Sequence, residues 1–400
     1  MTHRKNRMPE SNFPHGEQIP LRYLQGALLE QVSRLAETFE ATASARDRQG
    51  GTPKRERDLL RKSGLLGAFV ATELGGLGAS WPEILDMVRL LARVDGSIAH
   101  VFGFQHLMLA TLRLFGSSDQ WRPRHEETVA HAHFWGNALN PRDRTTRIEA
   151  RGDHYLLSGT KSFSSGSVDA DWLVVSAIDS ATEKLVVAFL PSDRQGLRVA
   201  GDWDNIRQRQ TDSGTVAFHE VVVHQHELLT DPGPLATPFA ALRPLLAQSI
   251  LVNVYLGLAE GALAQAKRYR RDPGAALEPY QLRRGGELFV AIDAARELAD
   301  SAAARLHGCL EREAALTEAE RGSAAVRVAS AKVASTRAAL DVTSQLFDIA
   351  GARATTTALN LDRFWRNART HTLHDPVDLR LRELGEFSLL GKLPTPSFYS

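Results

Sequence analysis

The sequence predicts a mainly α protein with a central β unit, because three stretches of the chain differ in hydrophobic periodicity. Residues 21–133 repeat apolar side chains every three or four positions, as helices do. Residues 134–235 hold short β-branched and aromatic runs between Gly, Asp, Ser and Pro, which favours a compact antiparallel sheet. Residues 236–375 return to helical spacing and favour a four-helix bundle. The flanking segments, 1–20 and 376–400, are expected to be a disordered N-terminus and an extended tail.

Four helices are predicted in the first stretch. One face of the first carries apolar residues at helical spacing: Leu28, Val32, Leu35 and Phe39. The second follows Thr52-Pro53 and ends at Gly64, a proline start and a glycine stop. A capping box from Ser80 to Glu83 opens the third. The fourth, 97–115, is apolar on all sides and is therefore expected to be buried.

The remaining elements follow from β-rich runs and from alanine content. Strands are predicted around four runs: 155–157, 172–175, 185–190 and 221–223. The alanine-rich stretch 317–350 predicts a long helix of the bundle.

Composition excludes several classes of function. Lys+Arg and Asp+Glu number 48 and 47, so the net charge of +1 gives no sign of nucleic-acid binding. The single cysteine, Cys309, rules out a disulfide within the chain and fits a reducing cytoplasm. No run of 18 apolar residues and no signal-peptide core is present, so no membrane span is expected.

Common catalytic motifs are absent. The sequence has no P-loop, no dinucleotide-binding glycine fingerprint and no HExxH zinc motif. Two His-x-His pairs occur, His131/His133 and His224/His226, but without further ligands they favour surface histidines, and no metal is expected. Ser165 lacks the flanking glycines of a hydrolase nucleophile elbow.

Three loop segments resemble the acyl-CoA dehydrogenase superfamily: 72–78, 159–166 and 209–214. The resemblance covers roughly residues 25–400. It implies the three-domain fold of that superfamily, with an N-terminal helical domain, a middle antiparallel β domain and a C-terminal four-helix bundle. It also implies a bound flavin.

Other segments are similar to the dibenzothiophene monooxygenase group of sulfur-compound monooxygenases. They are 202–203, 209–214, 253–257, 351–353, the string from Asp362 to Pro376, and the tail 394–398. This resemblance implies a two-component monooxygenase: a separate NAD(P)H-dependent flavin reductase supplies reduced FMN, which reacts with O2 through a C4a-hydroperoxyflavin. The substrate would be an organosulfur or similar small compound, with amine oxygenation also open, and the assembly a homotetramer. An FAD-dependent acyl-CoA dehydrogenase or oxidase stays as the alternative.

The residues themselves argue against a dehydrogenase. That reaction needs a carboxylate base. No glutamate lies between Asp362 and Arg380, and residues 241–259 hold neither Asp nor Glu, so Glu260 is the first. Imidazoles stand at the expected base position instead, which suits proton donation or relay to activated oxygen.

The resemblance assigns candidate site residues. The catalytic candidates are His371, His374 and Ser165, and the substrate candidates are Phe104, Gln105, His106 and Trp203. The flavin candidates are Asn137, Phe163, Ser165, Trp203, Arg283 and Arg353. Each also has an ordinary structural interpretation: a helix-end histidine, a turn serine, an Asx turn at Asn137, a core tryptophan, or a surface ion pair of either arginine.

The sequence departs from the family at two places. Gln105 stands where relatives carry a histidine near the flavin, and the adjacent His106 is turned by about 100° on a helix. Gly285 replaces a family tyrosine. Both departures bear on the identity of the substrate.

Overall fold

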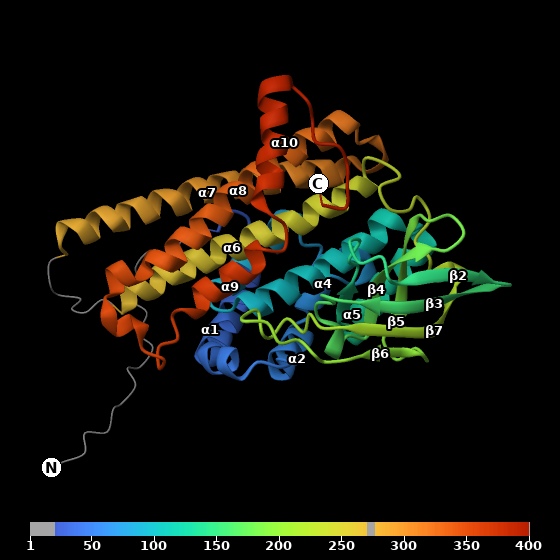
Figure 1. Cartoon of the computed structure of the whole chain (residues 1–400), viewed down its shortest axis with the longest axis horizontal. Coiled ribbons are helices and arrows are strands. Elements are labelled where there is room, and N and C mark those ends of the chain that lie inside the picture. The colour runs from blue at the N-terminus through green and yellow to red at the C-terminus, as the bar shows by residue number, and fades with distance from the viewer. Residues whose placement is uncertain (1–20, 270–276, 400) are drawn as a thin grey trace, which may run out of the picture.

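The computed structural model describes residues 21–269 and 277–399, and its elements follow the predicted order of helices, sheet and helices (Figure 1). The prediction for residues 1–20 falls outside the described residues. The mainly α fold with a central β unit is confirmed.

Five helices form the first part: α1 (Gly26–Gln49), α2 (Lys54–Ser63), α3 (Trp81–Ala92), α4 (Gly96–Phe115) and α5 (Ser118–His131). The predicted boundaries have their expected causes. Gly64 ends α2 in the left-handed region with φ 75°, where glycine is least strained. The backbone N–H of Ser80 donates to Glu83 Oε2 at 2.8 Å and closes the capping box of α3.

The central sheet has seven strands: β1 (Trp135–Ala138), β2 (Arg147–Arg151), β3 (His154–Lys161), β4 (Trp172–Asp179), β5 (Leu185–Pro191), β6 (Leu197–Val199) and β7 (Val216–His224). Their order is β1-β4-β2-β3-β7-β6, with β5 beside β4. The prediction of a purely antiparallel sheet is wrong, because β4 pairs in parallel with both β1 and β2. The long connection through the β2–β3 hairpin provides the crossover that a parallel β1–β4 pair requires.

The bundle consists of α6 (Arg243–Arg268), α7 (Pro279–Arg312), α8 (Glu318–Ala350) and the shorter α9 (Arg363–Thr372), which lies against α6 and α8. The predicted extended tail is wrong for its first half, because α10 (Val377–Leu390) is helical and packs on α8. Only Arg380 of α10 is buried, so the helix packs on α8 without burying an apolar face. Residues 391–399 form neither helix nor strand.

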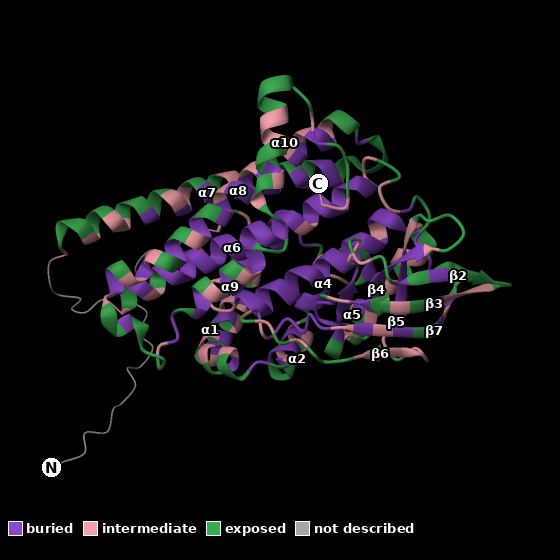
Figure 2. Ribbon diagram, viewed as in Figure 1, coloured by how far each residue is buried: buried purple, intermediate pink, exposed green. Residues whose placement is uncertain are grey.

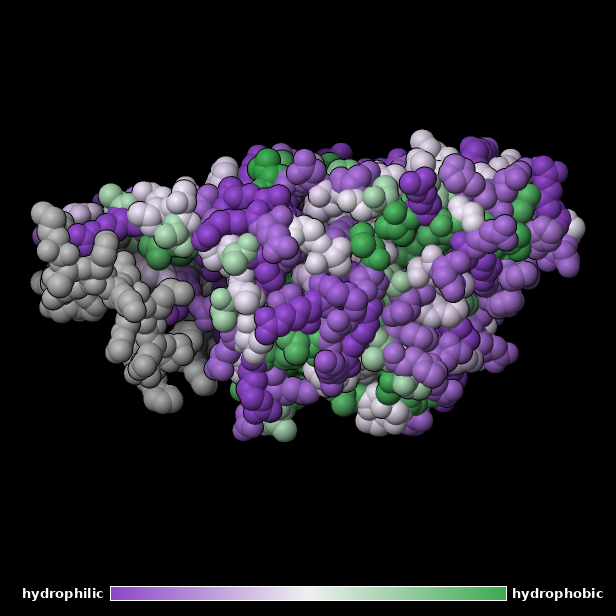
Figure 3. Space-filling view, turned by 90° about the horizontal axis from the view of Figure 1, so that it is seen from below, coloured by the Kyte–Doolittle hydropathy of each residue, from purple (hydrophilic) through white to green (hydrophobic). Residues whose placement is uncertain are grey.

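Burial explains the apolar composition of two helices. α4, and α6 with the turn before it (Ala240–Arg268), are long and apolar enough to cross a membrane by length and composition alone. In each helix, 94% of the most apolar 18-residue stretch is buried inside the protein. Figure 2 shows both as buried helices at the centre, and the face in Figure 3 is mostly hydrophilic with separate apolar patches. Both helices therefore form the core on which the sheet and the bundle meet.

Candidate active site

A histidine of α4 contacts the serine loop that follows β3. His100 is 5% exposed, and its Nε2 lies 3.0 Å from Ser165 Oγ. Ser165 Oγ also lies 2.8 Å from Ser213 Oγ, which donates to Thr211 Oγ1 at 2.7 Å. Thr211 in turn donates to the carbonyl oxygen of Gln208 at 2.9 Å. Four side chains thus form one hydrogen-bonded line that ends at an imidazole.

The direction of this line follows from the number of protons. A carbonyl only accepts, so the Thr211 proton points to Gln208 and the Ser213 proton to Thr211. Ser165 must then donate to Ser213, and His100 Nε2–H must donate to Ser165. His100 Nδ1, which is buried without a hydrogen-bond partner, keeps its lone pair for a ligand.

His371 faces this centre from the C-terminal end of α9. Its ring centroid lies 4.8 Å from that of His100, and its Nδ1 has no hydrogen-bond partner. The backbone oxygen of His371 accepts a hydrogen bond from Tyr255 Oη at 2.9 Å, and Lys332 Nζ donates to the same hydroxyl at 3.2 Å. The N–H of His374 donates to that backbone oxygen at 3.0 Å. Contacts from α6 and α8 therefore fix where α9 places its imidazole.

All three imidazoles are neutral at pH 7. Burial lowers the pKa of His100 to about 3, and His374 lowers it further when it is itself protonated. Burial, then His100, His374 and Lys332, hold the pKa of His371 well below its ordinary value. His374 stays accessible to solvent, yet desolvation by the surrounding protein lowers its pKa to about 4. A neutral imidazole still both donates and accepts a hydrogen bond.

An exposed aromatic surface adjoins the serine loop. The Phe163 side chain is 60% exposed, and its ring stands edge-on to Trp203 with centroids 5.9 Å apart. Trp203 Nε1 donates to the oxygen of Gln208 at 2.7 Å. Phe163, Gln208 and Asp212 all have positive φ, at 55°, 58° and 47°, a strain that tends to gather at functional sites. Apolar rings beside a line of hydroxyls fit a flat, partly polar ring system such as a flavin.

Asn137 lies next to the serine loop and also makes the expected turn. Its backbone N–H donates to the oxygen of Ser165 at 2.8 Å. Its Oδ1 accepts from the N–H of Leu139 at 3.2 Å, as in an Asx turn. The structure shows the Asx turn, and the role of Asn137 beside a flavin stays a prediction.

The α4 assignments need a correction. Phe104 does reach the site, because its ring stacks on His100 with centroids 4.1 Å apart. Gln105 instead joins α4 to other elements: its Nε2 donates to the oxygens of Leu66 and His133. His106 packs edge-on to Phe102 and has no hydrogen bond on either ring nitrogen.

The histidine that faces the site is His100, which the sequence-based search missed. It stands four residues before Phe104, so one helical face carries both. That spacing was the available signal. Ser213 and Thr211 lie in the segment 209–214, whose hydroxyls were not singled out either.

The two arginines do not reach this centre within one chain. Arg283 lies near the start of α7, at the end of the bundle far from the sheet (Figure 1). Its side chain is 82% exposed and pairs with Glu287 at 3.0 Å. Arg353 is also exposed and lies in the turn after α8. The start of α7 and the end of α8 lie side by side, because Gln281 Nε2 of α7 donates to the backbone oxygen of Ile349 of α8 at 3.5 Å. Both arginines therefore mark one end of the bundle.

Glu260, the first carboxylate of the bundle sequence, is paired with arginines. Glu260 is fully buried between Arg93 and Arg296, at 2.7 and 3.3 Å. Desolvation alone would raise its pKa, but Arg93 and Arg89 keep it lowered. Within residues 21–269 and 277–399, no carboxylate hydrogen-bonds to His100, Ser165 or His371. A dehydrogenase base is not formed here.

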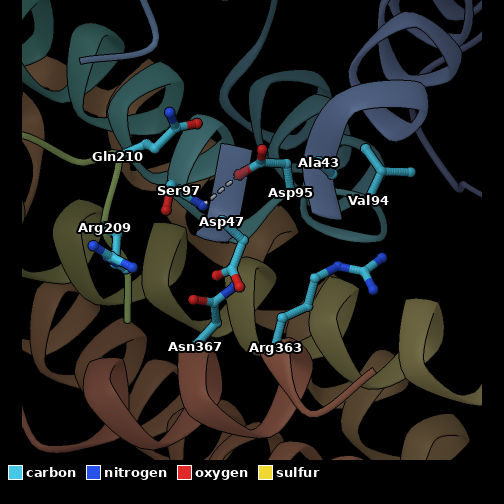
Figure 4. Close-up of a pocket in the computed structure, with 9 residues that line it drawn as sticks. All are labelled: Ala43, Asp47, Val94, Asp95, Ser97, Arg209, Gln210, Arg363 and Asn367. Atoms are coloured by element: carbon cyan, nitrogen blue, oxygen red, sulfur yellow. Dashed lines mark hydrogen bonds between the residues drawn. The ribbon is translucent and has the colours of Figure 1, made fainter. Parts of the chain in front are cut away.

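Two hollows lie elsewhere. One of about 10 Å³ lies among α1, α4, α9 and the 209–210 segment and holds about one water molecule, so it is too small for a substrate (Figure 4). Its lining is mostly polar, with Asp47, Asp95 and Arg363 among the nine residues. A second, of about 650 Å³, lies along α7 and shares no residue with the Ser165 line.

Comparison with known proteins identifies the family of this chain. Family models described as the N-terminal, middle and C-terminal domains of acyl-CoA dehydrogenase match residues 24–123, 138–221 and 249–378. A Pseudomonas putida protein named "Probable FMNH2-dependent monooxygenase SfnC" is 51% identical over 92% of this chain and 95% of its own. The chain belongs to the acyl-CoA dehydrogenase family, in its flavin-dependent monooxygenase branch.

Solved structures give the same result. Methanesulfinate monooxygenase MsuC from Pseudomonas fluorescens superposes with a TM-score of 0.91 at 48% identity, over 94% of this chain and 100% of its own. FMN-bound TdsC, a dibenzothiophene monooxygenase from Paenibacillus sp. A11-2, has a TM-score of 0.88 at 40% identity, over 93% and 99%. The predicted three-domain architecture is thereby confirmed.

Proposed function

We propose that this protein is a two-component monooxygenase that uses reduced FMN and O2 to oxygenate a small organosulfur compound. The observation that carries the proposal is the His100–Ser165 hydrogen bond, with His371 facing it and no hydrogen-bonded carboxylate among the described residues. The names of SfnC, MsuC and TdsC support the cofactor and the sulfur chemistry. The alternative, an acyl-CoA dehydrogenase with FAD, is less well supported, because Glu260 is held by two arginines and no carboxylate of residues 21–269 and 277–399 hydrogen-bonds to this centre.

Reduced FMN, when bound, would supply the electrons that activate dioxygen. The chain's own residues bind, orient and exclude water. Ser165 presents its hydroxyl in a direction fixed by Ser213 and His100. Phe163 and Trp203 offer the apolar face for the flavin ring, and Phe104 extends it towards the substrate. The same line fixes the orientation of the His100 ring and leaves its Nδ1 lone pair available to a ligand.

His371 acts as a hydrogen-bond donor or acceptor rather than as a charged acid. Its lowered pKa leaves the ring neutral at pH 7, and its Nδ1 has no partner in the protein. His374 follows one turn later, accessible to solvent, and suits a proton relay between the centre and water.

A second copy of the chain would complete the flavin site. Arg283 and Arg353 are exposed at the end of the bundle, and an arginine fork suits a phosphate. Large apolar side chains are exposed nearby on α7, with Tyr280 at 65%, Phe289 at 57% and Val290 at 64%. Such a surface favours association. We therefore also propose a homotetramer, served in the cytoplasm by a separate flavin reductase.

Isotope transfer tests the function. Chemically reduced FMN and the protein are mixed with ¹⁸O2 and a panel of sulfides, sulfoxides, sulfones and sulfinates, with catalase present. One ¹⁸O atom per turnover is expected in the product of at least one compound. Unlabelled substrates throughout the panel, together with reduction of bound FAD by an acyl-CoA, would reject the proposal.

A further inference from the structure

Basic side chains from different elements lie near His374. Arg142 is linked to it through the Tyr399 ring, and Lys332 through the Tyr255 hydroxyl, which donates to the backbone oxygen of His371. After desolvation, the pKa of His374 is lowered by Lys332 of α8, by Arg142 of the β1–β2 connection and by Arg243 of α6. Every charged group that shifts the pKa of this imidazole is positive. His374 itself is accessible to solvent. A small molecule that reaches His374 therefore meets positive charge from several sides.

Arg243 has an unsatisfied donor in this cluster. Its side chain is 5% exposed, and its Nε donates to Thr111 Oγ1 at 3.3 Å. Its Nη2 is buried without a hydrogen-bond partner. A buried guanidinium nitrogen without an acceptor is costly, so an anion supplied by a ligand would stabilise it.

The tail supplies one wall of the same place. The Arg142 guanidinium lies 4.2 Å above the Tyr399 ring, whose centroid is 6.5 Å from that of His374. Arg380 Nη1 and Gln248 Nε2 donate to the backbone oxygen of Tyr399, at 2.9 and 3.4 Å. The last described residue is thus tied to the protein and holds Arg142 in position.

The carboxylates nearby do not neutralise the cluster. Asp375, next to His374, lies 3.5 Å from Arg380 Nε and accepts from Gln248 Nε2 at 3.2 Å. Glu383 lies 3.0 Å from the same arginine. Burial lowers the pKa of Lys332 to about 7, and Asp375 is the carboxylate that acts on it. Among the ion pairs of residues 21–269 and 277–399, neither Arg142 nor Arg243 has a carboxylate partner, so these two cations are not neutralised.

We propose that Arg142, Arg243 and Lys332 form an anion subsite beside His374, which holds the acidic group of the substrate. The inference rests on the proposed function and narrows it: the substrate is a small sulfur oxyacid such as a sulfinate, and not a neutral thiophene. Oxygen transfer to the sulfur of a sulfinate would give a sulfonate. One atom of O2 joins the sulfur, the other leaves as water, and reduced FMN provides the two electrons.

Calorimetry of the protein without flavin tests the subsite directly. Methanesulfinate and benzenesulfinate serve as anionic probes, and dimethyl sulfone and dibenzothiophene as neutral ones. The sulfinates are expected to bind and the neutral probes to bind at least tenfold more weakly. Arg142→Gln and Arg243→Gln should each weaken sulfinate binding by about tenfold to a hundredfold, the range of a charge-assisted hydrogen bond.

Matched variants separate charge from folding. Arg142 is exposed, so its replacement should leave the fold intact, and Arg243→Lys keeps the charge and should retain most of the affinity. Arg151→Gln on β2, where the side chain is 57% exposed, is the control and should bind like the unchanged protein. In turnover, the charge-removing variants should raise KM for the sulfinate and leave kcat within a few-fold.

The outcomes distinguish the two proposals. Equal affinity for sulfinates and neutral probes, or sulfinate affinity unchanged in both glutamine variants, would overturn the subsite. If a neutral sulfur compound is oxygenated while sulfinates do not bind, the subsite fails and the monooxygenase stands. Sulfinate binding lost in both variants, with no ¹⁸O transfer to any compound, would support the subsite and reject the proposed function.

Discussion

The Ser165 centre and the end of the bundle that carries Arg283 and Arg353 differ in how complete they are. At the centre, His100, Ser165 and His371 are each less than a tenth exposed and meet within one chain. At the bundle end, the Arg283 side chain is 82% exposed and pairs only with its helical neighbour Glu287 among the ion pairs found in residues 21–269 and 277–399.

This difference suggests that the two regions serve different tasks, one the reaction and the other the binding of the cofactor. A buried centre excludes water and fixes donor directions, whereas an exposed ion pair contributes little to stability. We infer that the first region sets the rate and that the second holds the flavin phosphate once another chain is present. Replacements in the two regions should therefore have different signatures.

The largest effect is expected at His371. His371→Ala should lower kcat on the order of 10²–10⁴-fold, because a positioned imidazole is lost from the centre. Steady-state oxygenation and hydrogen peroxide release would be measured together. His154→Ala on β3 is the control and should keep normal rates. A His371→Ala enzyme with an unchanged rate would remove His371 from the centre.

Ser165→Ala should lower kcat by about 10²–10³-fold, since His100 loses its acceptor and Ser213 loses its donor, so the imidazole of His100 is no longer held in one orientation. The control is Ser176→Ala, a buried serine of β4 whose hydroxyl has no partner. FMN affinity should change by less than kcat does. The opposite pattern, weaker FMN with normal kcat, would move Ser165 from catalysis to cofactor binding.

Arg283→Gln and Arg353→Gln should each raise the dissociation constant of FMN about tenfold, because one charge-assisted contact with a phosphate is lost. Fluorescence titration gives the constant, and light scattering gives the assembly state. Arg284→Gln is the neighbouring control. Normal FMN affinity in both variants of an intact oligomer would contradict the role of the bundle end.

The smallest effect is a change in acid stability at His106. Burial lowers the pKa of His106 to about 3. Between pH 6.5 and 3, His106 is therefore protonated in the unfolded chain but stays neutral in the folded protein. Stability is thus lost as pH falls through this window and is unaffected above it. His106→Leu should reduce the loss between pH 7 and pH 5 by about 2 kcal/mol.

Chemical denaturation at the two pH values measures this difference. KM for the substrate should stay unchanged, because His106 packs on Phe102 and not on the site. A rise in KM would return His106 to the substrate-binding residues.

Much of the fold followed from local pattern. The capping box at Ser80 and the glycine stop at Gly64 act within a few residues of the boundaries they set, so sequence spacing predicted them. The parallel pairing of β1 with β4 depends on distant strands and was missed. The helix α10 was missed although Val377, Leu381 and Leu384 stand at helical spacing, because the prolines at 394 and 396 were taken to mark the whole tail as extended.

The site divides in the same way. His371 and His374 were found because they lie in a characteristic string, and Ser165 because its loop resembles a family segment. His100 was missed although it lies on the predicted helix, since sequence alone did not show which face of α4 meets the serine loop. The subsite residues Arg142, Arg243 and Lys332 come from three separate elements and share no motif.

The sequence by itself determined the order of helices and strands, the family and the imidazoles that stand in place of a carboxylate base. These depend on neighbours a few positions apart. Only the tertiary structure decided that His100, and not Gln105 or His106, meets Ser165 across 65 residues of chain, and that basic side chains from three elements lie near His374. Such contacts depend on how α4, α6, α8 and α9 pack, because side chains at neighbouring positions of a helix point about 100° apart.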